Sequence, residues 1–172
     1  MLSKSIEGAI NDQINHEFSS AYVYLSMSAF FDRMSYPGFA HWARIQSQEE
    51  VVHAMKLFDY LNDRGGRVAL KAITEPQSDF SSVVAVFEHA LEQEKFVTQL
   101  IHRLYEFATT EKDYATQAAL VWFINEQVEE EKASTDIVEQ LRRIKDDKTA
   151  LLILDRELAQ RPAAQTPGAG EG

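Results

Sequence analysis

Cysteine is absent from the 172-residue sequence, which excludes disulfide frameworks, cysteine-ligated zinc sites and iron–sulfur clusters. Proline and glycine are scarce, with four and seven copies, and this scarcity of helix breakers favours long helices. Long apolar runs are missing too: no stretch of 18 uncharged apolar residues occurs, and the opening MLSKSIEGAINDQ contains no apolar signal-peptide core. We therefore expect a soluble cytoplasmic protein with no membrane partner.

Positive charge is also in short supply, since the formal net charge is -10. This balance argues against nucleic acid as a partner and suits the attraction of cations. The length suffices for one domain with a real core and is short for two. We expect a single domain over residues 1–161 and a disordered tail over 162–172, because PAAQTPGAGEG lacks the apolar residues of a packed segment.

Apolar residues recur at spacings of three and four along most of the chain, which predicts helices over about residues 4–33, 38–64, 80–109, 113–144 and 149–161. About 14 residues, from Gly65 to Ser78, connect the second and third helices. Because bundle connections usually have 2–8 residues, we expect this one to run the length of the bundle as a crossover. The predicted fold class is all-α, a ferritin-like four-helix bundle with a short fifth C-terminal helix.

Polar side chains interrupt the apolar stripe of each long helix near its midpoint. Midpoints of helices of equal length fall at one level in a bundle, whether neighbours run parallel or antiparallel. The interrupting residues should therefore converge on one place in the core. They are Glu17 on the first helix, Glu50 and His53 on the second, Glu94 on the third, and Gln127 and Glu130 on the fourth.

Several glutamates in one core predict a metal site. Buried ionised carboxylates destabilise a fold by several kcal/mol each, and neighbouring like charges add to this, so a pair of divalent cations would relieve the repulsion. Glu50 and His53, three residues apart, point to the same side of their helix and can share a metal, as Glu-x-x-His pairs do in di-iron bundles. Mixed carboxylate and imidazole ligation suits iron, manganese and zinc better than magnesium or calcium, but spacing does not choose among the three.

Other residues lie beside this predicted centre. Tyr24 follows Glu17 by seven residues on the same face, where it is either a core tyrosine with a bonded hydroxyl or a group that binds a ligand or lends an electron. Glu49, Glu126 and Glu129 adjoin the predicted ligands outside the apolar stripe. Such a charged cluster is usually a solvated face. Its position next to the metal site also favours a third cation position.

The sequence resembles the bacterial non-haem ferritins, iron-storage proteins that assemble as hollow cages of 24 chains. The resemblance covers about residues 3–160 in family order and spacing. It is carried by the segments NDQINHEFSSAYVYLSMS, GFAHWARIQSQEEVVHAMKLFDYL, RGGRV, EQEKFVTQLI and FINEQVEEEK. It implies a ferroxidase, which oxidises Fe²⁺ with O₂ or H₂O₂ and deposits ferric mineral in the cavity of a homo-oligomeric cage.

The resemblance also implies a ligand set. One iron position would use Glu17, Glu50 and His53, and the other Glu50, Glu94 and Glu130, with Glu50 bridging. Gln127 would sit beside these ligands or reach one iron, and Tyr24 matches the tyrosine beside the dinuclear centre. A third iron position would use Glu49, Glu126, Glu129 and Glu130. The short fifth helix would line a fourfold axis.

Two departures bear on subtype and on competing functions. Val51 stands where bacterioferritins carry a haem-ligating methionine, and the fourth helix has Gln127 and Glu130 instead of a second Glu-x-x-His, so no haem is expected. One competing interpretation is another di-iron or di-manganese bundle enzyme, such as a rubrerythrin relative, an oxygenase or a manganese catalase. Another is a metal-free structural or interaction bundle. The fifth helix and the asymmetrical ligand pairs favour ferritin over the first of these, and the second predicts that replacing Glu50 with Leu would stabilise the fold without loss of iron chemistry.

Overall fold

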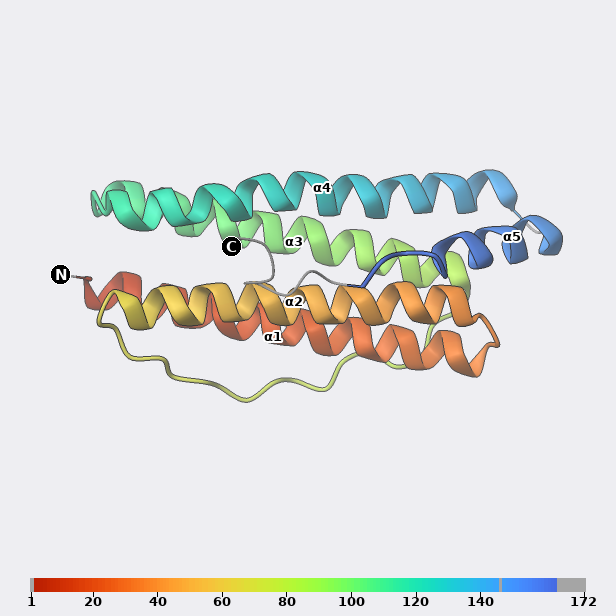
Figure 1. Cartoon of the computed structure of the whole chain (residues 1–172), viewed down its shortest axis with the longest axis horizontal. Helices are drawn as coiled ribbons and strands as arrows, with labels where there is room; N and C mark the ends of the chain where they lie inside the picture. The colour runs from red at the N-terminus through yellow and green to blue at the C-terminus, as the bar shows by residue number, and fades with distance from the viewer. Residues whose placement is uncertain (1, 146, 164–172) are drawn as a thin grey trace, which may run out of the picture.

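The computed structural model describes residues 2–145 and 147–163, and helices are the regular secondary structure of these residues. Figure 1 shows four long helices side by side as two antiparallel hairpins, with a short helix at one end. The expected four-helix bundle with a short fifth helix is confirmed. The elements are α1 (Lys4–Arg33), α2 (Pro37–Asp63), α3 (Val83–Thr110), α4 (Tyr114–Ile144) and α5 (Lys148–Leu158).

Capping side chains set where most helices begin. The side chains of Ser3, Ser82 and Asp113 accept hydrogen bonds from backbone N–H groups in the first turns of α1, α3 and α4. The Ser82 cap begins α3 at Val83, so the sequence-based start near residue 80 was too early. Phe80, which we had placed in that helix, instead packs from the preceding loop onto Phe30, with ring centroids 5.3 Å apart.

The bounds of the fifth helix also differ from the predicted ones. Asp147 caps it through the backbone N–H groups of residues 149 and 150, and it ends at Leu158, three residues before the predicted end. Residues 159–161 then return along α2 (Figure 1). Of the predicted tail over 162–172, residues 164–172 lie outside the described part of the chain.

The long connection between α2 and α3 runs along α1, as expected for a crossover (Figure 1). Near its start, the Asn11 side chain donates to the backbone oxygen of Arg67 at 2.9 Å and accepts from the N–H of Ala69 at 2.7 Å. Near its end, the Ser26 hydroxyl donates to the backbone oxygen of Gln77 at 2.7 Å. These bonds fix an irregular segment against one helix without a strand or helix of its own.

The apolar core consists of two clusters, one toward each end of the bundle. One cluster contains Phe31, Phe39 and Phe87, together with Leu154 of α5. The other contains Ile10, Leu57, Ile101 and Leu120. Between these two clusters, buried polar side chains from all four long helices form a layer. Apolar packing on both sides therefore supplies the stability, and it holds the polar layer in a region that water does not reach.

Candidate metal centre

All six predicted ligands of the dinuclear site are buried in this polar layer. Each side chain is at most 6% exposed. The ligand atoms of Glu17, Glu50 and His53 lie within 4.8 Å of one another, which is close enough for one metal ion to bind all three. A second group with the same spacing consists of His53, Glu126 and Glu130.

Amide groups orient two of the carboxylates. Gln13 Nε2 donates to Glu17 Oε1, one turn further along α1, at 2.8 Å. Gln46 Nε2 of α2 donates to Glu130 Oε2 of α4, also at 2.8 Å. Each bond occupies one oxygen of a carboxylate and fixes the direction of the other. Sequence reasoning did not assign these two glutamines to the site, although each stands four residues before a predicted ligand on the same helix face.

Glu94 receives two hydrogen bonds from neighbouring helices. The Tyr24 hydroxyl of α1 donates to Glu94 Oε1, and Gln127 Nε2 of α4 donates to Glu94 Oε2 at 3.2 Å. Gln127 Nε2 also lies 3.2 Å from the Glu94 backbone oxygen. In this arrangement Gln127 is a donor that positions Glu94, and Tyr24 is a buried tyrosine whose hydroxyl touches a predicted ligand.

Two carboxylate oxygens in the layer have no hydrogen-bond partner. They are Glu17 Oε2 and Glu50 Oε2, both fully buried. His53 Nδ1 lies 3.5 Å from Glu50 Oε2, too far for a good hydrogen bond. Buried polar atoms normally have partners, and leaving one without costs about 1–3 kcal/mol. Carboxylate oxygens and an imidazole nitrogen that lie close together are the kinds of atoms that bind iron, manganese or zinc.

Burial raises the pKa values of three carboxyl groups in the layer, those of Glu17, Glu50 and Glu94. Desolvation, followed by the charge of Glu50, raises the pKa of Glu17 to about 8. Desolvation and the charge of Glu130 raise the pKa of Glu94 to about 7, although hydrogen bonds from Tyr24 and Gln127 oppose the shift. Burial and the charges of Glu94 and Glu130 raise the pKa of Glu50 well above its usual value. Without a cation, the layer holds protons that a cation would release.

His53 faces both halves of the candidate centre. Its Nδ1 side faces Glu50, and its Nε2 lies 3.9 Å from Glu126 Oε1. The edge of its ring packs against Trp122, with centroids 5.4 Å apart. This packing fixes the imidazole plane, so that one nitrogen can ligate a metal while the other faces a carboxylate.

The residues predicted for a third cation position do not all lie close together. Glu126 lies near His53 and Glu130 in the second group described above. Glu49 Oε2 instead lies 2.5 Å from Arg161 Nη2, beyond the end of α5. Glu129 is exposed and belongs to neither group. The third position therefore stays a prediction.

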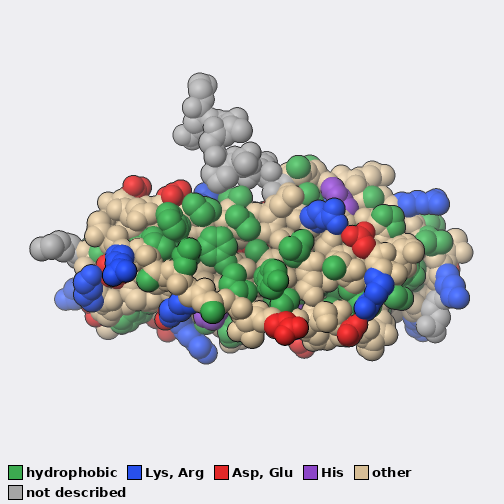
Figure 2. Space-filling view, turned by 90° about the horizontal axis from the view of Figure 1, so that it is seen from below, with side chains coloured by type: hydrophobic (Ala, Val, Ile, Leu, Met, Phe, Trp, Pro, Cys, Tyr) green, Lys and Arg blue, Asp and Glu red, His purple; other side chains and the backbone are tan. Residues whose placement is uncertain are grey.

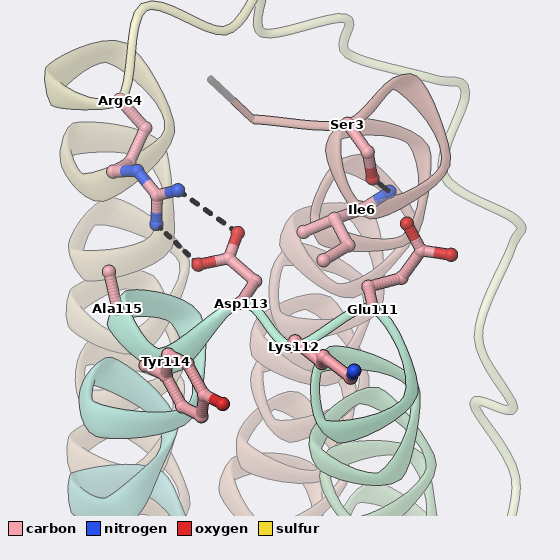
Figure 3. A pocket seen from close by; sticks show the side chains of 8 residues that line it. All are labelled: Ser3, Ile6, Arg64, Glu111, Lys112, Asp113, Tyr114 and Ala115. Carbon is pink, nitrogen blue, oxygen red and sulfur yellow. Dashed lines mark hydrogen bonds and ion pairs between the residues drawn. The ribbon is translucent and has the colours of Figure 1, made fainter.

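A surface pocket of about 300 Å³ lies at the end of the bundle where α3 turns into α4, away from the polar layer. Figure 3 shows Arg64, the residue that follows α2, paired with Asp113. The two nitrogen–oxygen distances of this pair are 3.0 and 3.1 Å. None of the predicted metal ligands lines this pocket. Its lining residues are Ser3, Ile6, Arg64, Glu111, Lys112, Asp113, Tyr114 and Ala115. This ion pair ties α2 to the N-terminus of α4 and offers no ligand set.

Comparison with known proteins identifies the family to which the chain belongs. A family model described as a ferritin-like domain matches residues 7–144. Over 161 residues the chain is 44% identical to a bacterial non-heme ferritin of Staphylococcus aureus, covering 94% of this chain and 97% of that one. It is 52% identical to a solved open pore ferritin of the archaeon Archaeoglobus fulgidus, with a TM-score of 0.94 and coverage of 94% and 100%. Among the described residues, no helix is long and apolar enough to span a membrane. The chain therefore belongs to the ferritin family, as the resemblance of its sequence predicted.

Proposed function

We propose that this chain is an iron-storage protein that oxidises Fe²⁺ at two positions in its polar layer and stores the ferric product inside a 24-chain cage. The single observation that carries the oxidation site is the group of Glu17, Glu50 and His53. The three side chains are buried and their ligand atoms lie close together, and two of the carboxylate oxygens have no hydrogen-bond partner in the described part of the chain. Family membership supports iron as the metal and storage as the purpose.

The first iron position would use Glu17, Glu50 and His53. The second would use Glu50, Glu94 and Glu130, with Glu50 as the bridge between the two. The position of Glu50 supports a bridging role, because burial and the charges of both Glu94 and Glu130 raise its pKa. Two dications would take the place of the protons on these carboxyls and remove the repulsion among them.

Holding two Fe²⁺ ions together suits a two-electron oxidation. Each ion gives one electron, so two Fe²⁺, one O₂ and two protons yield two Fe³⁺ and one H₂O₂. With peroxide as the oxidant, two Fe²⁺, one H₂O₂ and two protons yield two Fe³⁺ and two H₂O. Tyr24 would position Glu94 through its hydroxyl during this cycle.

Storage requires a cage, and the surface of the chain has a face suited to contact with another copy. Figure 2 shows hydrophobic side chains gathered on the side that carries α1 and the crossover. Exposed apolar residues on these segments include Tyr22, Leu25, Leu70 and Ile73, which are 43–65% exposed. Such a patch marks an interaction surface, and we propose that it is covered by a second copy in the assembled cage.

Stopped-flow mixing of the metal-free protein with Fe²⁺ in aerated buffer tests the proposal. We expect Glu50→Ala and His53→Ala to slow the fast phase of Fe²⁺ oxidation at least about tenfold, because each removes a ligand of the first position. Glu129→Ala is the matched control, since this exposed carboxylate should alter later turnovers more than the first oxidation. Unchanged rates in the ligand variants would contradict the assignment, and a monomer or dimer on size exclusion would contradict storage.

A further inference from the structure

The three residues that follow α5 return along α2 and end at a predicted ligand of the third cation position. The carbonyl oxygen of Arg161 lies 2.9 Å from His41 Nε2. Its guanidinium carbon lies 5.3 Å from the centroid of the Trp42 ring, and its Nη2 lies 2.5 Å from Glu49 Oε2. His41, Trp42 and Glu49 all belong to α2, so the Arg161 main chain and side chain are both held against one helix.

This segment is positioned by the docking of α5. The Asp155 carboxylate accepts from the backbone N–H of Phe39 at 2.9 Å, in the first turn of α2. Asp155 is 5% exposed and Leu154 beside it is 3% exposed, so α5 is attached by buried contacts. Arg161 lies six residues further along the chain. The reach of its guanidinium toward Glu49 is therefore set by a structured anchor.

Glu49 lies among other carboxylates, and the Arg161 guanidinium forms an ion pair with it. Burial and the charges of Glu130 and Glu126 raise the pKa of Glu49, whereas Arg161, and after it His53, oppose this shift. The side chains of Arg161 and Glu49 are 21% and 26% exposed. Arg161 Nη1 is buried and has no hydrogen-bond partner among the described residues, so the guanidinium uses only part of its donor set within them. An arginine bound so incompletely can be displaced more easily than one with all its donors paired.

We propose that Arg161 is the cation that occupies Glu49 in the metal-free chain, and that a metal ion must displace it to use Glu49 as a ligand. This inference rests on the proposed function, because it concerns the third cation position beside the two iron positions. Glu49 Oε2 cannot bind the guanidinium and a metal ion fully at the same time, and the positive charge of Arg161 repels a cation on the other oxygen. Arg161 therefore makes the third position weaker than the central two.

The competition is reciprocal by linkage. If Arg161 weakens metal binding at Glu49, then metal at Glu49 weakens the Arg161 contact by the same factor. Filling of the third position would loosen the Arg161 side chain from Glu49, while the Arg161 carbonyl keeps its contact with His41. The Arg161 side chain thereby senses whether metal has moved beyond the two central positions.

Anaerobic titration calorimetry of the assembled, metal-free protein with Fe²⁺ alone, and in parallel with Zn²⁺, tests this inference. Arg161→Gln removes the charge and keeps a polar side chain that is shorter. We expect it to tighten the weakest class of sites about tenfold while the central sites keep their affinity. Arg156→Gln is the matched control, because it removes the same charge from an exposed position on α5. Arg161→Lys should give an intermediate affinity, since it keeps the charge and loses the planar fork.

The double variant Glu49→Gln, Arg161→Gln assigns the effect to the right carboxylate. It should lose the tightened class, because the ligand itself is gone. If Arg161→Gln and Arg156→Gln bind metal alike, the Arg161–Glu49 contact is a structural ion pair only and the inference is wrong. If the unaltered protein lacks the two strong central sites, the proposed function itself fails. Crystals of Arg161→Gln grown with Zn²⁺ should show metal at Glu49, and its absence there would also overturn the inference.

Discussion

The carboxylate of Asp155 on α5 accepts a hydrogen bond from the backbone N–H of Phe39 on α2, although 116 residues separate the two in sequence. The residue before α2, Tyr36, makes no side-chain capping bond, and Pro37 occupies the first turn. A residue of the fifth helix thus serves as the cap that the local sequence does not provide. The N-terminus of α2 and the position of α5 stabilise each other.

Gly38→Ala should loosen this docking. A Cβ at Gly38 would lie 1.6 Å from the backbone oxygen of Asp155. A backbone atom cannot move aside as the end of a flexible side chain can. We expect a loss of about 1–3 kcal/mol in the free energy of unfolding, together with faster proteolysis after α5. Gly8→Ala is the control, because nothing lies within 4 Å of its Cβ position and alanine favours a helix interior by about 0.5–1 kcal/mol. Equal stability of the two variants would contradict tight docking.

The stability of the metal-free protein should fall as pH rises. The folded-state pKa of Glu17, about 8, lies above the ordinary glutamate value of 4.5, so between these values the native state binds more protons than the unfolded state. Its contribution is fully present below about pH 4.5 and is lost as pH approaches 8. Urea melts of chelator-treated protein from pH 5 to 8.5 should therefore show a declining free energy of unfolding. Glu17→Gln should flatten this decline, and Glu129→Gln should not.

Tyr24→Phe should make metal binding more sensitive to protons. The hydrogen bond from Tyr24 lowers the pKa of Glu94, against the effects of burial and Glu130, so its removal raises that pKa further. We expect Zn²⁺ affinity to drop several-fold at pH 6.5 and to match the unaltered protein at pH 8.5. Tyr22→Phe is the control, because Tyr22 is half exposed on the same helix. A drop of equal size at both pH values would instead indicate a purely structural effect.

Leu70→Glu should weaken assembly of the cage. Leu70 is 65% exposed on the crossover, within the apolar face that we propose to be covered by another copy. Burying a carboxylate there would be unfavourable, so size exclusion and light scattering should show smaller species. Leu70→Met, which conserves volume and apolar character, should assemble normally. An intact cage in Leu70→Glu would show that this face is not an interface between copies.

Much of the architecture follows from local rules. The spacing of apolar residues predicted four long helices and a short one, because burial of one helix face is written directly into the order of residues. The predicted start of α3 was wrong by three residues, since the Ser82 cap decides it. The predicted end of α5 was also wrong by three residues, since residues 159–161 instead pack against α2. The two glutamines, Gln13 and Gln46, were missed because an amide on a polar layer looks like any surface glutamine until its partner is known.

By itself, the sequence determined that Glu17, Glu50, His53 and Glu94 would lie on buried helix faces at one depth, since periodicity and helix length fix both face and level. Only the tertiary structure decided which atoms meet. It gathered ligand atoms of Glu17, Glu50 and His53 within 4.8 Å of one another and brought Arg161 to Glu49 across 112 residues of chain. Contacts between distant segments depend on how helices dock and turn, and no local pattern of residues encodes that geometry.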